Sequence, residues 1–400
     1  MADALRATID FTLSWTTFCG EHSDTQRVHL VDFSHDTLPG DFAEKLAELK
    51  IGESHSDVFS AGMLLGANYS IDAIKSFPAN KFKRTLKGQH IEPKLYRYYP
   101  TPIAREGLGA AQGDLRPFRI TSISNESISA DTNHPLAKYY LTLSATIVKH
   151  SPPSENKDRP SRNIARLITS KGSGMQVPFE FGDTALFSEY PLKREDESVD
   201  TMFYSTARLT HHIDAVARTE ISKLYSELIE KDSKVLDLMS SWESHLNPDL
   251  DLGEVTGLGL NKEELSANKQ LNDFVVHDLN MNQILPFEDG QFDTVICTAS
   301  IEYLTYPLKI MTEISRVLKP GGKFIVTFSD RWFPTKAVNL WGQLHPFERM
   351  QLVLEYFRDS GEFEELNTFS QRGLIRPRND PYYETKKFSD PLFAVWGQTS

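Results

Sequence analysis

Cysteine is scarce in this 400-residue sequence, which contains only Cys19 and Cys297. Two cysteines so far apart do not suggest a disulfide framework, so a reducing, cytoplasmic setting is expected. The cysteines and 12 histidines also lack the spacings of metal ligands, and no metal site is predicted. The first residues lack the basic start and apolar core of a secretion signal. No apolar run reaches the ~20 residues that cross a bilayer, so no membrane association is expected.

Positive charge is also in short supply. The chain has 43 Lys and Arg against 55 Asp and Glu, a formal net charge of -12. Because phosphate contacts need concentrated basic residues, general nucleic-acid binding is not expected. The length predicts two or three domains, and the 40% hydrophobic content is typical of globular ones. No pattern in the sequence indicates an oligomeric state.

Two polar stretches suggest where the chain divides. The segment SPPSENKDRPSRN (151–163) is rich in proline, serine and charge, and KREDESVD (193–200) is a second polar run. Such composition is typical of exposed connections. We therefore predict an N-terminal unit at 1–150, a linker with a lid-like segment at 151–200, and a C-terminal unit at 201–400.

The N-terminal unit has mainly strand patterns. ATIDFTLSW (7–15) and YYLTLSATIV (139–148) alternate apolar and polar residues. Between them, DFAEKLAELKIGE (41–53) has helical spacing and ends at Gly52, where a helix C-cap favours glycine. These patterns predict an α+β unit in which a short helix packs against an antiparallel sheet.

Three stretches of this unit resemble FKBP-type prolyl isomerases of the SlyD kind. They are TLPGDFAEKLAELKIGES (37–54), FPANKF (77–82) and ISADTNHPLAKYYLTLSATIV (128–148). The resemblance covers nearly all of the predicted unit. It implies an FKBP-like domain with a β-rich, chaperone-like subdomain inserted at about 75–135.

The resemblance also implies a proline-binding pocket in which Asp24 matches the catalytic-site aspartate. Three positions that are aromatic in the family are leucine here, which favours a peptide-binding or chaperone-like module over an active isomerase. Tyr69 is an alternative source of one missing ring, and plain core packing is an alternative role for the leucines. The implied pocket residues are Leu13, Asp24, Leu38, Leu65, Tyr69 and Leu143.

Strand and helix patterns alternate in the C-terminal unit. Short buried-looking strands are predicted around 235–236, 254–260, 274–276, 292–297 and 323–328, with helices at 213–228 and 307–318, and two late strands at 363–369 and 391–397. Alternation of this kind predicts a doubly wound α/β sheet, Rossmann-like in class.

Two stretches of this unit resemble class I S-adenosylmethionine-dependent methyltransferases. They are ILPFEDGQFDTVICTASIEYL (284–304) and ISRVLKPGGKFIVTFS (314–329). The resemblance implies S-adenosyl-L-methionine as the cofactor, a final antiparallel strand pair, and a methyl acceptor that is either a polypeptide or a small molecule.

The cofactor motifs depart from the family pattern at two places. Met239 stands where a glycine is usual, and Gly259 stands where an acid usually binds the ribose. Ser240 and Ser241 are predicted to donate to the cofactor carboxylate, and Asn261 to replace the missing acid. The full set implied for cofactor binding is Asp237, Ser240, Ser241, Asn261, Asp278, Leu279 and Ser300.

Catalytic residues are harder to identify, because many methyl transfers need alignment rather than a dedicated base. Glu302 is the first candidate by position and His345 the second, with Tyr303 and Arg331 as further possibilities. The segment FYSTARLTHHID (203–214) is a candidate lid, in which the residues of interest are Tyr204, Arg208 and His212. Two alternatives stay open, a non-catalytic methyltransferase-like scaffold and an active prolyl isomerase with a passive C-terminal unit.

Overall fold

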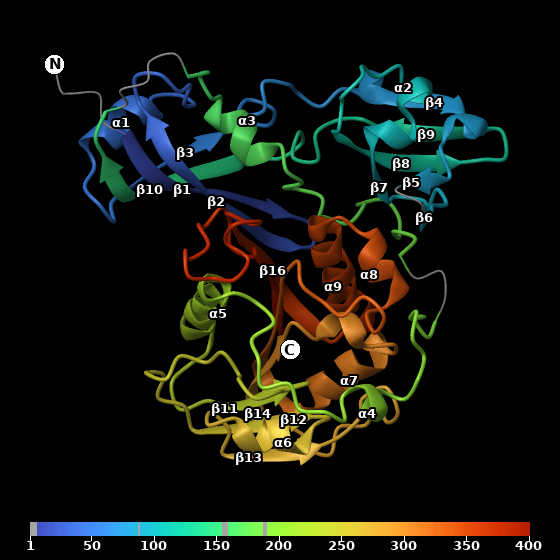
Figure 1. The fold of residues 1–400 in the computed structure, drawn as a ribbon. Coiled ribbons are helices and arrows are strands. Elements are labelled where there is room, and N and C mark those ends of the chain that lie inside the picture. Colours follow the sequence, from blue (N-terminus) through green and yellow to red (C-terminus); the bar gives the residue numbers. More distant parts are fainter. Residues whose placement is uncertain (1–5, 87–88, 154–158, 187–189) are drawn as a thin grey trace. The chain divides into compact units, whose positions relative to one another are not determined.

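The computed structural model describes residues 6–86, 89–153, 159–186 and 190–400, which form two compact units divided after Ser188 (Figure 1). Each unit is described by itself below. None of the helices within the described ranges is both long enough and apolar enough to span a membrane.

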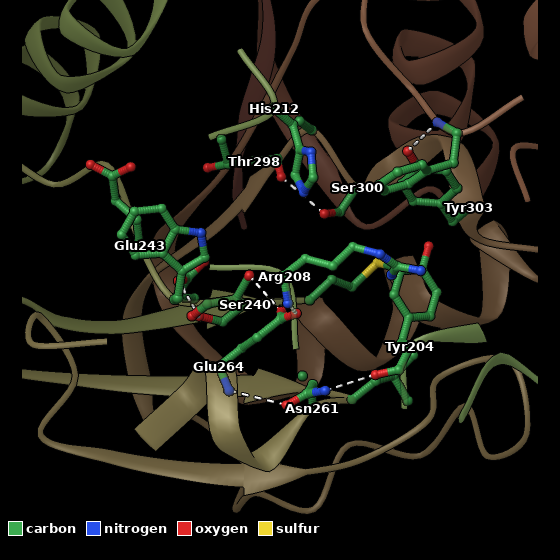
Figure 2. Close-up of a pocket in the computed structure, with 18 of the residues that line it drawn as sticks. Tyr204, Arg208, His212, Ser240, Glu243, Asn261, Glu264, Thr298, Ser300 and Tyr303 are labelled. Atoms are coloured by element: carbon green, nitrogen blue, oxygen red, sulfur yellow. Dashed lines mark hydrogen bonds between the residues drawn. The ribbon is translucent and has the colours of Figure 1, made fainter. Parts of the chain in front are cut away.

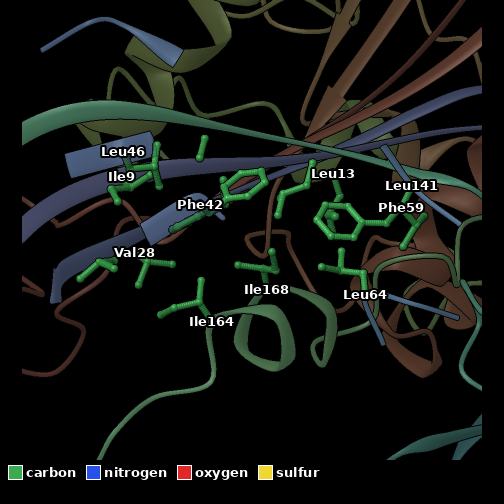
Figure 3. Packing of buried hydrophobic residues seen from close by; sticks show 14 of the residues in the cluster. Ile9, Leu13, Val28, Phe42, Leu46, Phe59, Leu64, Leu141, Ile164 and Ile168 are labelled. Carbon is green, nitrogen blue, oxygen red and sulfur yellow. The ribbon is translucent and has the colours of Figure 1, made fainter. Parts of the chain in front are cut away.

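The first unit contains a four-stranded antiparallel sheet in the order β2-β1-β10-β3. Its strands are β1 (Arg6–Thr17), β2 (Gly20–Asp32), β3 (Ser54–Phe59) and β10 (Leu141–Ser151). Helix α1 (Phe42–Glu48) contributes the buried Phe42 and Leu46 to the same hydrophobic cluster as the sheet (Figure 3). The predicted α+β arrangement, a short helix on an antiparallel sheet, is therefore present.

A second β-rich subdomain lies between β3 and β10 in the chain. Its four-stranded sheet has the order β4-β9-β8-β7, and β5 and β6 form a separate pair. It has its own core, which includes Phe77, Phe118 and Ile128. Its elements are η1 (Ile71–Ala73), β4 (Ile74–Pro78), η2 (Ala79–Lys81), β5 (Thr85–Leu86), β6 (Gln89–His90), β7 (Tyr98–Pro100), η3 (Thr101–Ile103), α2 (Arg105–Leu108), β8 (Pro117–Ile123) and β9 (Ser127–Asp131).

The segment predicted as a linker, 151–200, is not an exposed connection where the structure describes it. Helix α3 (Ile164–Thr169) buries Ile164 and Ile168 in the core of the first unit. Polar composition misled the prediction here, because Arg159 and Arg162 of this segment pair with acidic residues of the first unit. The first unit accordingly extends to Ser188, well beyond the expected end at residue 150.

Asp36 anchors the start of this segment. Its fully buried carboxylate accepts from Arg159 at 3.0 Å and from Arg162 at 2.6 Å. Burial by itself raises the pKa of Asp36, but the bonds from Arg162, Arg159 and the Asp32 amide outweigh it and hold the pKa at about 2. The ion pairs therefore stabilise the ionised form in the folded state.

The second unit contains a seven-stranded run in the order β13-β12-β11-β14-β15-β17-β16. Strands β11 to β15 are parallel, whereas β17 pairs antiparallel with both β15 and β16. Helix α5 lies on one side of the sheet, and α7 and α9 lie on the other (Figure 1). The predicted doubly wound sheet and its final antiparallel pair are confirmed.

No segment is predicted for α4, α6, α8 or α9, whereas the predicted strands and the helices α5 and α7 agree closely with the bounds of the elements in this unit. They are α4 (Asp200–Phe203), α5 (Ala215–Leu228), β11 (Lys234–Leu238), β12 (Glu254–Gly259), α6 (Lys262–Ala267), β13 (Asp273–Val276), β14 (Phe292–Thr298), η4 (Ile301–Tyr303), α7 (Pro307–Val317), β15 (Leu318–Phe328), α8 (Asn339–Gln343), α9 (Pro346–Ser360), β16 (Phe363–Arg372) and β17 (Leu392–Thr399).

Replacing Asp36 by Asn should lower the free energy of unfolding at pH 7 by about 2 kcal/mol, because Arg162 loses its counter-charge and Arg159 keeps only Asp32. The folded pKa is depressed, so this contribution is complete above the unfolded value near 4 and lost as the pH falls toward about 2. Urea unfolding followed by circular dichroism should therefore show a smaller difference at pH 3 than at pH 7. The exposed Glu48→Gln variant is the control; an undiminished difference at pH 3 would contradict the assignment.

Candidate functional site

A cavity of about 270 Å³ lies at the carboxyl ends of the parallel strands β11, β12, β13 and β14 (Figure 2). The strand order reverses at β11 and β14, and ligands of open α/β sheets bind at such a switch point. All the residues that line the cavity belong to the second unit.

The loop after β11 passes very close to the end of β12. The Ser240 amide donates to the Leu258 carbonyl at 2.7 Å, and a Cβ placed on Gly259 would lie 2.2 Å from the Ser240 carbonyl oxygen. Met239 has a φ of 58°, a left-handed conformation that costs a non-glycine residue roughly 1–2 kcal/mol. Met239 thus adopts the turn conformation that glycine usually provides at this place. Position 259 must be glycine because the loop after β11 passes so close to it.

Asp237 is 2% exposed and accepts from the Ser240 hydroxyl at 2.5 Å. Burial raises its pKa to about 6, although the hydroxyls of Ser240 and Ser244 act in the opposite direction. The Ser241 hydroxyl donates to Glu264 Oε2 at 2.7 Å. Both serines line the cavity. However, their hydroxyl groups donate to Asp237 and Glu264 of the protein itself. This arrangement therefore does not support the predicted donation to a cofactor carboxylate.

Asn261 also lines the cavity, but its side chain caps helix α6. Its Oδ1 accepts from the amides of Glu263 and Glu264, and its Nδ2 donates to the Tyr204 carbonyl at 2.8 Å (Figure 2). With oxygen and amide both engaged, Asn261 orders the segment at Tyr204 rather than replacing the missing acid. Glu264, in the first turn of α6, brings a carboxylate to the cavity in place of the usual strand-end acid.

Asp278 and Leu279 follow β13 and line the same cavity. Asp278 Oδ1 accepts from the amides of Asn280 and Met281 in a tight turn. Its Oδ2 is buried, and no residue that the structure describes donates a hydrogen bond to it. An unpaired buried carboxylate oxygen is costly, so a donor from a ligand would be stabilising there.

The segment predicted as a lid forms one wall of the cavity. Arg208 donates from its backbone to Glu264 Oε1 at 2.7 Å, and its guanidinium lies 5.4 Å from the Phe333 ring centre. The His212 ring lies 5.1 Å from the Phe333 ring, edge to face. Partial burial lowers the pKa of His212, the Glu264 carboxylate opposes this effect, and the positive charges of Arg208 and Arg331 add to it. The imidazole is therefore neutral near pH 7.

Trp242 lines the cavity where the loop after β11 meets the segment predicted as a lid. Its Nε1 donates to the Thr210 carbonyl at 3.3 Å, and its ring centre lies 4.5 Å from that of His211. The indole thus joins the loop after β11 to the segment around residue 210.

The predicted catalytic residues divide into two groups. Ser300, Tyr303 and Arg331 line the cavity, but Glu302 and His345 do not. Glu302 is 1% exposed in the protein interior, where burial raises its pKa to about 7. His345 is the N-cap of α9 and accepts from the Phe347 amide at 3.3 Å, with its pKa lowered to about 4 by burial. Neither position supports the predicted catalytic role, because Glu302 lies in the interior and His345 caps a helix.

The residues implied for a proline pocket lie in the first unit. Leu13 and Leu143 are 0% exposed and face each other in the β1–β10 register, while Leu38 and Leu65 pack against the same cluster. The remaining two also have partners: Asp24 accepts from the Ser173 hydroxyl at 2.5 Å, and Lys138 lies 4.2 Å from the Tyr69 ring centre. In this conformation the two central leucines have no surface for a peptide, and a role in binding stays a prediction.

Sequence reasoning missed Glu264 and the pairing of Ser240 with Asp237. The spacing Asn261-x-x-Glu264 was a usable signal, because an asparagine followed three residues later by glutamate is typical of a helix start. It indicates that the glutamate returns toward the N-cap, which places its carboxylate at the carboxyl end of β12.

Replacing Asp237 by Asn should raise the melting temperature of the ligand-free chain at pH 7.5 by about 2–4 °C, because a carboxylate no longer has to ionise in the interior. The folded pKa of about 6 exceeds the unfolded value near 4, so the gain should shrink as the pH falls through 6 and vanish below 4. Thermal unfolding at pH 7.5 and pH 4 measures this. Asp249→Asn, on the surface, is the control, and equal gains at both pH values would refute the assignment.

Comparison with known proteins finds similarity to methyltransferases. Residues 242–326 match the methyltransferase domain family model. A demethylmenaquinone methyltransferase of Staphylococcus haemolyticus is 31% identical over 144 residues, which are 32% of this chain and 59% of that protein. The corresponding enzyme of Lactiplantibacillus plantarum is 28% identical over 170 residues, 36% of this chain and 72% of that protein. A putative methyltransferase from Bacillus halodurans is 17% identical, with a TM-score of 0.31, over 46% of this chain and 97% of that structure. The chain therefore spans less than two thirds of the first of these relatives and contains a region similar to methyltransferase domains.

Proposed function

We propose that the second unit is an S-adenosylmethionine-dependent methyltransferase whose cofactor binds in the cavity at the switch point. The observation that carries this proposal is the buried Asp278 Oδ2, which no described residue satisfies. The methyl-transfer resemblance of the sequence and the match of 242–326 to methyltransferase domains support the same reading.

The residues present fit this cofactor at three points. Asp278 offers an acceptor for the adenine amino group, with Leu279 beside it. Glu264, held by Ser241 and the Arg208 amide, keeps lone pairs for ribose hydroxyls. The loop after β11, whose close approach requires Gly259, lines the cavity where the amino-acid portion would lie.

The cofactor, when bound, supplies the transferable methyl group. The chain's own contribution is to bind and orient, since methyl transfer is accelerated mainly by alignment of donor and acceptor. The wall formed by Arg208, His212 and Phe333 reduces the access of water from one side. Ser300 and Tyr303, at the end of β14, lie next to the space where an acceptor would meet the donor.

For the first unit we propose a SlyD-like polypeptide-binding module, with the methyl acceptor being either a bound polypeptide or a small molecule. The short helix on an antiparallel sheet and the β-rich subdomain between β3 and β10 are consistent with this proposal. Tethering a chain-binding module to a transferase raises the local concentration of a polypeptide acceptor.

Replacing Asp278 by Asn should weaken the binding of S-adenosylhomocysteine by about tenfold, because an amide can keep the turn while losing the acceptor for the adenine amino group. Isothermal titration calorimetry measures this. The control is Asp273→Asn, at the exposed start of β13, which should bind as the unmodified chain does. Absence of binding to the unmodified chain would instead favour a non-catalytic scaffold.

The full chain should not accelerate a proline-limited refolding reaction, because Leu13 and Leu143 have no exposed surface to receive a proline ring. The measurement is the rate of the slow refolding phase of a substrate protein, with a known isomerase as the positive control. Clear acceleration by the chain would show that the first unit opens a pocket absent from this conformation.

A further inference from the structure

Arg331 lines the cavity from the loop after β15 and has no counter-charge. No hydrogen bond or ion pair joins its guanidinium to any residue in the described parts of the chain; its recorded neighbour is the Tyr382 ring, whose centre lies 5.2 Å away. The side chain is half-buried. A partly desolvated guanidinium without an acid is a favourable partner for an anion.

The carboxylates elsewhere in the cavity do not neutralise Arg331. Glu243 is paired with Arg218 at 3.1 Å, and Asp200 accepts from Arg194 at 2.8 Å. Asp237, Glu264 and Asp278 follow β11, β12 and β13, on the side assigned to the cofactor. The end of the cavity nearest β14 and β15 therefore has an excess of positive charge.

Flat rings line the cavity together with Arg331. Phe333 lies two residues from Arg331, with ring centres 6.2 Å from that of Tyr303 and 5.1 Å from that of His212. His212 projects toward Ser300 in Figure 2. Its neutral imidazole offers one hydrogen-bond donor and one acceptor. An aromatic wall beside a guanidinium and a neutral imidazole is suited to a planar ring that carries a negatively charged oxygen group.

We propose that this end of the cavity is the acceptor subsite, and that it binds a planar conjugated ring bearing an anionic oxygen group, with Arg331 as the counter-charge and Phe333 against the ring. This inference rests on the proposed methyltransferase function and names the class of its acceptor. Arg331 is a specificity-determining residue for the charged group, and a polypeptide acceptor without such a group does not satisfy it.

The probe is benzoate, titrated at low salt into the full chain saturated with S-adenosylhomocysteine and observed by saturation-transfer NMR. Benzamide has nearly the same shape without the charge, and cyclohexanecarboxylate has the charge without the flat ring. Benzoate should bind about tenfold more tightly than benzamide, because it alone forms a charge-assisted bond to Arg331. It should also bind more tightly than cyclohexanecarboxylate.

Arg331→Gln should remove the preference for benzoate over benzamide while leaving the affinity for S-adenosylhomocysteine unchanged, which also shows that the variant folds. The matched control is Arg378→Gln, an exposed arginine outside the cavity lining, which should keep the preference. Equal binding of benzoate and benzamide, undetectable benzoate binding, or an unchanged preference in Arg331→Gln would overturn the proposal. If S-adenosylhomocysteine itself fails to bind, the proposed function fails first, whereas its binding without benzoate refutes the acceptor subsite alone.

Discussion

The close approach of two backbones determines the rest of the candidate site. The Ser240 carbonyl lies where a Cβ of Gly259 would have to be, so the end of β12 accepts only glycine. No side chain at that position can reach a ligand. The carboxylate therefore comes from Glu264, one turn into α6, and that glutamate also holds the Arg208 amide and the Ser241 hydroxyl. The contact thus links the strand end, the first loop and the wall formed by residues 203–213.

The buried carboxylates of the second unit differ in what satisfies them. Asp237 is satisfied by serine hydroxyls and contributes to the shape of the loop. Glu302 lies outside the cavity, in an interior where burial favours its protonated form. Only Asp278 combines a place in the cavity lining with an oxygen that has no donor among the described residues. Burial of a carboxylate alone therefore does not indicate a functional residue here. A carboxylate oxygen that is buried at the cavity and lacks a donor is a more specific indication.

The sequence predicts the second unit well because its strands and helices carry local patterns. The apolar faces of α5 and α7 and the buried strands are visible as periodicity, and Asp278 follows directly from its place after β13. The predicted linker fails because Asp36 lies 123 residues from Arg159 and 126 from Arg162, so their mutual neutralisation leaves no local signal. The predictions that Asn261 binds the cofactor and that His345 is catalytic fail for a related reason. Capping uses the same polar side chains that bind ligands, and only the structure shows which role they have.

The carboxylates of the candidate cavity that have no arginine partner among the described residues all follow strands β11 to β13. Asp237, Glu264 and Asp278 follow the three strands β11 to β13, whereas Arg331 follows β15. A sulfonium cofactor is positively charged near its reactive centre and carries hydroxyl and amino donors elsewhere, so the acidic end suits its nucleoside portion. An anionic acceptor beside Arg331 would then approach the sulfonium from the β15 side. Asp200 and Glu243 would not repel it strongly, because each is paired with an arginine. Opposite charges on donor and acceptor attract each other in a partly desolvated space, which favours the close alignment that methyl transfer needs. The same separation would hinder a cationic acceptor, because Arg331 would repel it before any bond could form.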